Sequence, residues 1–241
     1  GGYGSSGFYG AFRENATDFQ KSFVTYFTDF LSMVKKQDCP LDFFSWHIYT
    51  DDTSEIVKSA LFVRETLDNN GFNHTESHLN EWNYGAEGGG FDKMDTLYGA
   101  AFIASALIAM QSIPVDAAQY YCASYEARYN GLMNIRTLKY SPVMHVMNAF
   151  AKLYENGNEL SVRRKEDEPF ILASADETTV RGLISCYRCE KKEFVLKASD
   201  DCEVYRLKES GFEAITIRNE NGSIRLPCHN DEVYYVTLKI V

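Results

Sequence analysis

The 241-residue sequence has no long uninterrupted apolar run and no excess of basic residues. Its most apolar stretch, LYGAAFIASALIAM, is shorter than the roughly 20 residues that a membrane-spanning helix needs, so it predicts a buried helix. The chain carries 34 acidic against 24 basic residues, a formal net charge of −10. This balance argues against nucleic acid and against an anionic membrane surface as partners, because binding to either depends on basic residues.

Motifs for metals and cofactors are also scarce. The six cysteines include one CxxC, Cys186 and Cys189, but no second CxxC stands at the spacing of a zinc site. The segment HTESH lacks the helical HExxH context of a zinc enzyme, and AEGGGFD contains no GxGxxG after a strand. We therefore expect free structural thiols, no metal and no cofactor.

The N-terminal segment GGYGSSGFYGAF has neither an initiator Met nor the basic-then-apolar pattern of a signal peptide. We expect from this abrupt start that the chain is part of a longer protein. The sequence predicts no compartment.

The first two thirds of the sequence alternate between helical and strand periodicity. Ser54 and Ser141 are the expected N-caps of two helices, and Pro142 is typical of the first helical position. The alternation predicts a parallel sheet with right-handed crossovers and about four β/α units, half of a (β/α)8 TIM barrel. Helices are predicted at residues 13–36, 54–71, 91–111 and 141–157, and strands at residues 41–50, 77–83 and 115–124.

The pattern of residue types changes after residue 157. Short β-branched and aromatic segments such as PFILASAD, VRGLISCYR and EVYYVTLKI are separated by turn residues, which predicts an antiparallel sandwich. The predicted fold class is therefore α/β plus all-β. Residues 1–157 would form the C-terminal half of a TIM barrel, and residues 158–241 an accessory β-sandwich.

Polar side chains gather at the ends of two predicted strands. In DFFSWHIY one face is apolar, and the other becomes polar at His47 and Tyr49. Because side chains alternate along a strand, SHLNEWN is expected to place Ser77, Leu79 and Glu81 on one face. If that face is the barrel interior, Glu81 reaches the C-terminal rim beside His47 and Tyr49, where active sites of such barrels lie. A salt-bridged Glu81 and a hydrogen-bonded core histidine form the alternative reading.

The same motifs resemble a known group of enzymes. DFFSWHIY followed by LNEWN is similar to strands six and seven of retaining glycoside hydrolases of clan A, above all glycoside hydrolase family 39, the β-xylosidase and α-iduronidase group. In that family strand six carries D-F-x-S-x-H-x-Y, and strand seven ends in T-E-W, whose Glu is the nucleophile. GGYGSSGFYGAF resembles the strand-five segment, VDAAQYYCAS stands where strand eight belongs, and a trailing β-sandwich is usual.

The resemblance implies a retaining, β-xylosidase-like glycosidase that hydrolyses O-glycosidic bonds. Glu81 would be the nucleophile, and the expected substrate-binding residues are His47, Tyr49, Trp82, Tyr125 and Glu126.

The sequence also departs from the family pattern. Asn80 stands where Thr is common, and Tyr121 stands where strand eight often has a Trp. The family's acid/base is a Glu after an Asn at the end of strand four, and no Asn-Glu pair of this sequence fits that position. We therefore expect the isolated chain to be inactive, and a missing N-terminal half-barrel or a second copy to be its partner beside the carbohydrate substrate. The alternatives are a non-catalytic carbohydrate-binding or interaction protein with a decayed barrel, or a clan A enzyme of family 30 or 51.

Overall fold

A computed structural model describes residues 4–85, 90–123, 131–134 and 136–240. The chain divides into two compact units, Gly1–Glu87 with Ala109–Tyr121, and Gly88–Ile108 with Cys122–Val241. The predicted domain boundary after residue 157 stays a prediction.

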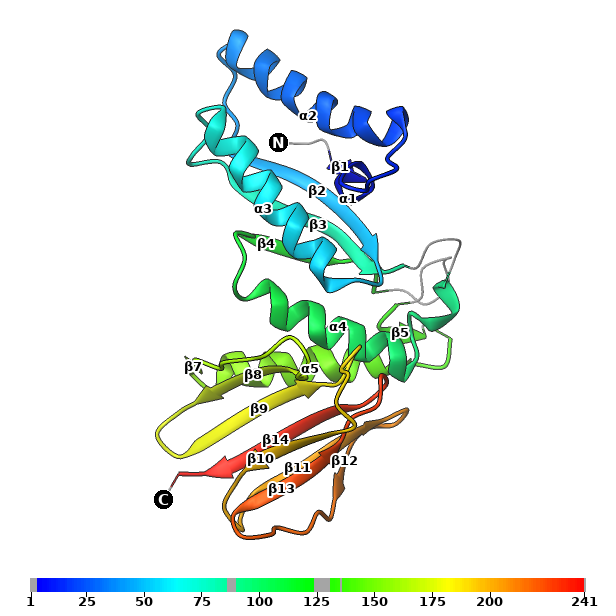
Figure 1. The fold of residues 1–241 in the computed structure, drawn as a ribbon, viewed down its shortest axis with the longest axis vertical. Helices are drawn as coiled ribbons and strands as arrows, with labels where there is room; N and C mark the ends of the chain where they lie inside the picture. The colour runs from blue at the N-terminus through cyan, green and yellow to red at the C-terminus, as the bar shows by residue number, and fades with distance from the viewer. Residues whose placement is uncertain (1–3, 86–89, 124–130, 135, 241) are drawn as a thin grey trace. The chain divides into compact units, whose positions relative to one another are not determined.

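The first unit is built on a four-stranded parallel sheet of order β1-β2-β3-β4. Helix α3 packs on β2 and β3, and α2 packs on α1 and β1 (Figure 1). The alternation of helix and strand follows the predicted order. The elements are β1 (Gly4–Ser6), α1 (Phe8–Ala11), α2 (Asp18–Lys36), β2 (Phe43–Thr50), α3 (Thr53–Asn69), β3 (Glu76–Tyr84) and β4 (Ala117–Tyr120).

The two long helices of this unit begin at side-chain caps. Thr17 and Gln20 form a capping box at the start of α2, in which each side chain bonds the other's backbone N–H. At the start of α3 the cap is Asp52, whose carboxylate accepts from the backbone N–H of Ser54 at 2.8 Å. The prediction of Ser54 as N-cap is therefore wrong, because the helix begins at Thr53 and its N-cap is Asp52, two residues before Ser54.

Aromatic rings fill the space between the helices and the sheet. Phe27 of α2 stacks on Phe44 of β2 with ring centroids 4.0 Å apart. The indole of Trp46 is buried and donates to the hydroxyl of Ser77 at 3.1 Å, so the only polar atom of that ring is satisfied. This bond also shows that Ser77 and Trp46 lie on the same face of the sheet, the one that carries the apolar side chains of β2.

The second unit contains helices and antiparallel sheets. Its largest sheet has six strands in the order β12-β11-β14-β9-β8-β7, and β10 pairs with β13 in a separate sheet. The elements are η1 (Phe91–Lys93), α4 (Leu97–Met110), β5 (Met133–Asn134), β6 (Lys139–Tyr140), α5 (Pro142–Glu155), β7 (Asn158–Leu160), β8 (Phe170–Ala175), β9 (Thr179–Ser185), β10 (Glu193–Lys197), β11 (Glu203–Lys208), β12 (Gly211–Ile215), β13 (Ser223–Pro227) and β14 (Val233–Lys239).

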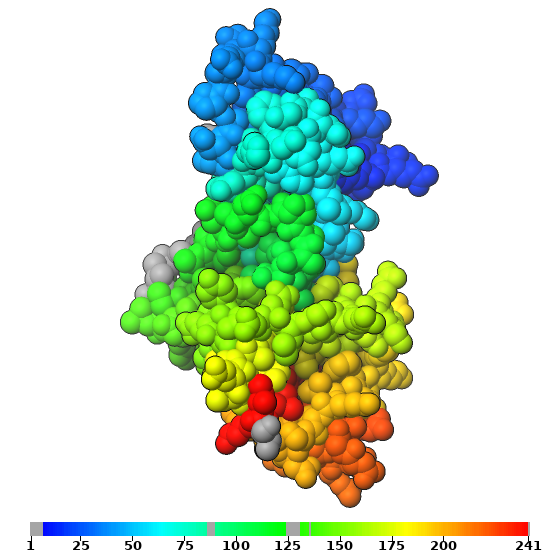
Figure 2. All heavy atoms as spheres, turned by 90° about the vertical axis from the view of Figure 1, so that its left-hand side faces the viewer, coloured from blue at the N-terminus to red at the C-terminus, as the bar shows by residue number. Residues whose placement is uncertain are grey.

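The β10–β13 pair and the six-stranded sheet share one apolar core. Ile184, Val204 and Val236 come from the larger sheet, and Ile224 and Leu226 come from β13. Helix α5 packs on the same sheet through β8, β9, β11 and β12. Figure 2 shows its heavy atoms, in yellow-green, against the yellow and red atoms of the sheet.

These observations confirm a fold of mixed helix and sheet. Ser141 is the N-cap of α5 and Pro142 its first residue, as predicted. Among the residues described, no helix is long and apolar enough to cross a membrane.

Candidate functional site

The predicted site lies where β2 and β3 run side by side in the first unit. The two strands pair in parallel, with Trp46 opposite Leu79, His47 opposite Glu81 and Tyr49 opposite Asn83. The register shifts between Trp46 and His47, because β3 contains one extra residue there. That extra residue is Asn80, and the irregularity is a β-bulge.

The bulge corrects the predicted facing of β3. Side chains that are paired in register point to the same face, so Leu79 lies with Trp46, and both are fully buried. Glu81 lies with His47 on the opposite face. Strict alternation, which would keep Leu79 and Glu81 together, is therefore wrong across Asn80. The predicted meeting of Glu81 with His47 is nevertheless found, because the bulge reverses the parity.

Glu81 is held by two side chains of β2. Its Oε1 accepts a hydrogen bond from the Tyr49 hydroxyl, and its Oε2 lies 3.4 Å from Nδ1 of His47. The side chains of His47 and Glu81 are each 28% exposed, so solvent reaches the pair. A carboxylate that is held by one hydrogen bond, approached by an imidazole and open to solvent on one side is placed to meet a ligand.

Trp82 does not join this group. It is 2% exposed and pairs with Ile48 on the face opposite to Glu81, and its ring meets Tyr120 edge-on at 5.6 Å. Its indole N–H has no hydrogen-bond partner among the residues described. The substrate-binding role of Trp82 stays a prediction, and from this position the ring would act on the site through the backbone of β3.

Two neighbouring residues fix the end of β3. The Asn83 amide donates to the carbonyl of Tyr121 at 2.7 Å, and the Tyr121 N–H donates to the Trp82 carbonyl. Asn83 is 1% exposed, so the chain that follows β4 is tied to the strand that carries Glu81. Tyr125 and Glu126, the remaining predicted substrate-binding residues, lie outside the described residues.

A cavity of about 320 Å³ borders His47 and Tyr49 on the side of α1. Its wall includes Tyr9 and Arg13, which the sequence reasoning missed. The Arg13 guanidinium lies 5.7 Å from the centre of the Tyr9 ring and 3.3 Å from a carboxylate oxygen of Glu55. Burial, and then the charge of Glu55, raise the pKa of Tyr9. Tyr9 and Arg13 follow β1 in the sequence, after the end of a strand of the same sheet, and this position was the only signal in the sequence that could have indicated them.

Cys39 lies in the first unit, the other five cysteines lie in the second, and all six are free thiols. A hydrogen bond with Cys228 and burial raise the pKa of Cys186 far above that of an ordinary thiol. The described residues contain no group of three His, Cys, Asp or Glu side chains placed to hold a metal ion.

The chain is similar to known proteins in its structure. No protein-family model and no curated protein sequence matches the chain. Solved structures do match. A glucosidase from Croceicoccus marinus is 20% identical, with a TM-score of 0.67 over 88% of this chain and 56% of its own. A GH39 β-xylosidase from Caulobacter crescentus is 17% identical, with a TM-score of 0.68 over 88% of this chain and 54% of its own. A GH39 enzyme from Xanthomonas axonopodis pv. citri is 14% identical, with a TM-score of 0.65 over 95% and 66%.

The chain thus spans between 54% and 66% of the length of these structures. At such low identities the likeness establishes the fold and leaves the activity to be argued from residues. The predicted resemblance to the C-terminal part of a clan A glycoside hydrolase is confirmed at the level of the fold.

Proposed function

We propose that this chain carries the nucleophile of a retaining glycosidase, and that the nucleophile is Glu81. The observation that supports this most strongly is the pairing of one carboxylate with Tyr49 and His47 in the C-terminal halves of two adjacent parallel strands. Catalytic groups of β/α barrels lie at that end of the strands. The substrate would be an O-glycoside, and the β-xylosides of the matching structures are the first class to test.

In this proposal Glu81 attacks the anomeric carbon and forms an ester with the sugar, while the glycosidic C–O bond breaks. A general acid protonates the departing oxygen. The same group then removes a proton from water, which attacks the ester and restores the Glu81 carboxylate. The Tyr49 hydroxyl orients Glu81, and His47 approaches its second oxygen.

The general acid would come from outside the described residues. In the parallel sheet of the described residues, no Asn-Glu pair other than Asn80-Glu81 lies on a strand. Retaining enzymes need a second carboxyl group about 5–5.5 Å from the nucleophile. Loss of proton transfer costs a factor of about 10²–10⁴ in rate, so the 241-residue chain alone is expected to be essentially inactive.

We further propose that the parallel sheet of the first unit is half of a TIM barrel and that residues 158–241 form an accessory sandwich. The edge strands β1 and β4 each pair with one neighbour within the described residues. Unpaired strand edges favour pairing with another strand. A preceding half-barrel or a second copy of the chain would supply it, and a monodisperse monomer in light scattering would contradict both.

A carbohydrate-binding protein without catalysis is the second candidate. It is favoured by the absence of a further Asn-Glu pair on the strands of the parallel sheet in the described residues. In that case Glu81 would bind sugar hydroxyls, and its loss would weaken binding without any turnover to lose.

Substitution of Glu81 distinguishes the catalytic function from the carbohydrate-binding function. In the longest protein that contains this chain and hydrolyses an aryl β-xyloside, Glu81→Gln is expected to lower kcat about 10³-fold or more, because an amide does not form the glycosyl ester. Glu76→Gln is the matched control, since Glu76 lies on the same strand and its side chain is 60% exposed. It should leave kcat within about two-fold.

An unchanged kcat in Glu81→Gln would contradict the nucleophile assignment. Absence of turnover in every longer form, together with sugar binding that Glu81→Gln weakens, would favour the carbohydrate-binding function instead.

A further inference from the structure

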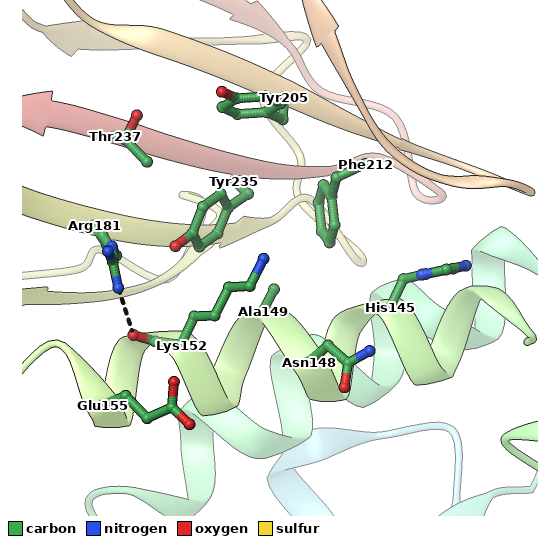
Figure 3. Close-up of a pocket in the computed structure, with 10 residues that line it drawn as sticks. All are labelled: His145, Asn148, Ala149, Lys152, Glu155, Arg181, Tyr205, Phe212, Tyr235 and Thr237. Carbon is green, nitrogen blue, oxygen red and sulfur yellow. Dashed lines mark hydrogen bonds between the residues drawn. The ribbon is translucent and has the colours of Figure 1, made fainter.

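A second concave site lies in the second unit, between α5 and the face of the six-stranded sheet that is opposite to the sandwich core. It has a volume of about 660 Å³, within the range of small-molecule sites. Side chains of α5 line one side, and side chains of β9, β11, β12 and β14 line the other (Figure 3). We call it the α5 groove.

The sheet side of the α5 groove is aromatic. Tyr205 pairs with Tyr235 across β11 and β14, and their ring centroids are 6.3 Å apart. The ring of Phe212 on β12 lies 5.9 Å from Tyr235. Tyr235 is 8% exposed, and its hydroxyl has no hydrogen-bond partner among the described residues. The rings of Tyr205 and Phe212 are tilted by 54° and 53° to that of Tyr235, so the wall is an angled apolar surface with one unused hydroxyl. Such a surface suits a ring-shaped ligand that carries polar substituents.

The same groove holds two cations that form no ion pair within the described residues. Hydrogen bonds from Thr178 and Thr179, and then the charge of the nearby Arg181, lower the pKa of Asp176. Arg181 of β9 donates to the backbone carbonyl of Lys152 at 3.3 Å, and neither side chain forms an ion pair with a carboxylate among the described residues. The Lys152 side chain extends from α5 toward the sheet (Figure 3). In a chain of net charge −10, two cations that line one groove without ion pairs offer an anionic group a place to bind.

Two acidic side chains, those of Glu203 and Glu155, lie in or beside the α5 groove. Glu203 accepts hydrogen bonds from Tyr205 and Thr237, at 2.9 and 3.2 Å, and so holds the aromatic wall in place. Glu155 lines the groove near the end of α5 without an ion pair among the described residues. With the amide of Asn148, it supplies hydrogen-bonding groups for hydroxyls.

We propose that the α5 groove binds an acidic sugar unit, a pyranose ring bearing a carboxylate within an oligosaccharide. The ring would pack on Tyr235 and Phe212, and the carboxylate would lie between Lys152 and Arg181. An uncharged sugar would leave both cations unused, and a simple anion would leave the aromatic wall unused. This proposal is independent of the role of Glu81, because every residue it uses lies in the second unit.

Calorimetric titration of the 241-residue chain tests the proposal, with trigalacturonate and xylotriose as an acidic and a neutral trisaccharide of equal length. Trigalacturonate is expected to bind at least about ten-fold more tightly than xylotriose, because only it engages both cations. Lys152→Met should weaken trigalacturonate binding at least about five-fold, because it removes one charged donor.

The matched control is Lys197→Met, which removes the same charge from an exposed position on β10. It should change the affinity less than about two-fold, because exposed charges at a distance are screened. Thermal unfolding of both variants checks that the fold is retained. Glu155→Gln should tighten trigalacturonate binding, since it removes a like charge.

Three results would overturn the proposal. These are xylotriose binding as tightly as trigalacturonate, equal effects of Lys152→Met and Lys197→Met, or no heat of binding for trigalacturonate. Displacement of trigalacturonate by inorganic phosphate at equal concentration would also overturn it, because charge alone would then explain the binding.

Discussion

In the first unit a single carboxylate, Glu81, is held by the Tyr49 hydroxyl and approached by His47. In the second unit two cations, Lys152 and Arg181, share a groove without a carboxylate partner among the described residues. Both sites use neighbouring strands to bring side chains together. The two sites differ in the register of the strands that carry them. The parallel β2–β3 pair contains a bulge, and the antiparallel β11–β14 pair keeps a regular register.

This difference in register determines where the alternation of side chains along a strand predicts the face on which each residue lies. In β14 the alternate residues Tyr234 and Val236 enter the sandwich core, and Tyr235 faces the α5 groove. Simple alternation therefore assigns both faces correctly. In β3 the extra residue Asn80 puts Leu79 and Glu81 on opposite faces. A strand with one interrupted repeat can thus carry a buried apolar half and a functional polar end.

The largest expected effect comes from deleting one residue of the regular ladder. Deletion of Tyr235 from β14 would turn the residues beyond it to the wrong face and remove a buried aromatic ring. We expect it to lower the free energy of unfolding by at least about 4 kcal/mol, or to abolish folding. Urea unfolding monitored by circular dichroism measures this.

Deletion of Asn80 is the matched change in the bulged ladder. It would restore a regular pairing in which Leu79 still faces Trp46 and Glu81 still faces His47. We therefore expect a cost below about 2 kcal/mol. Equal destabilisation by the two deletions would contradict the distinction between the two strands.

A smaller effect is expected for the hydrogen bond to Glu81. Tyr49→Phe removes a donor to a carboxylate, a bond that contributes about 1.5–3 kcal/mol. If Glu81 is the nucleophile, kcat/KM of the active protein should fall about 10- to 100-fold. Tyr154→Phe is the control, because Tyr154 is 84% exposed. A Tyr49→Phe protein with unchanged kcat/KM would argue that Tyr49 does not support the reaction.

The smallest effect concerns the start of α3. Asp52→Ala should lower the free energy of unfolding by about 1 kcal/mol, because it removes the cap on the Ser54 N–H. Ser54→Ala, the substitution at the cap expected from sequence, should cost less than about 0.5 kcal/mol. Thermal unfolding of both proteins distinguishes them, and the reverse order would restore Ser54 as the cap.

Much of the fold followed from local patterns. The helical periodicity of α2 and α5, the strand β2 and the short strands of the second unit were each predicted from spacing and turn residues. The cap at Asp52 was missed because a serine two residues later fits the same pattern. Non-local order was out of reach, since the order β12-β11-β14-β9 cannot be read from the chain sequence.

The candidate site was predicted in part. The meeting of His47, Tyr49 and Glu81 was expected, but Asn80 gave no sign of a bulge, because bulges depend on how two strands pair. Tyr9 and Arg13 were missed because their approach to β2 depends on the packing of α1. The α5 groove depends on contacts between β9, β11, β12 and β14, so its aromatic wall was invisible in the sequence.

The central claim is that Glu81 forms a covalent bond with the sugar. A 2-deoxy-2-fluoro glycoside traps that ester in a retaining enzyme, because the fluorine slows its hydrolysis. Incubation with an active protein containing this chain, followed by peptide mass spectrometry, should place one fluorosugar on Glu81. A fluorosugar on any other carboxylate would contradict the assignment.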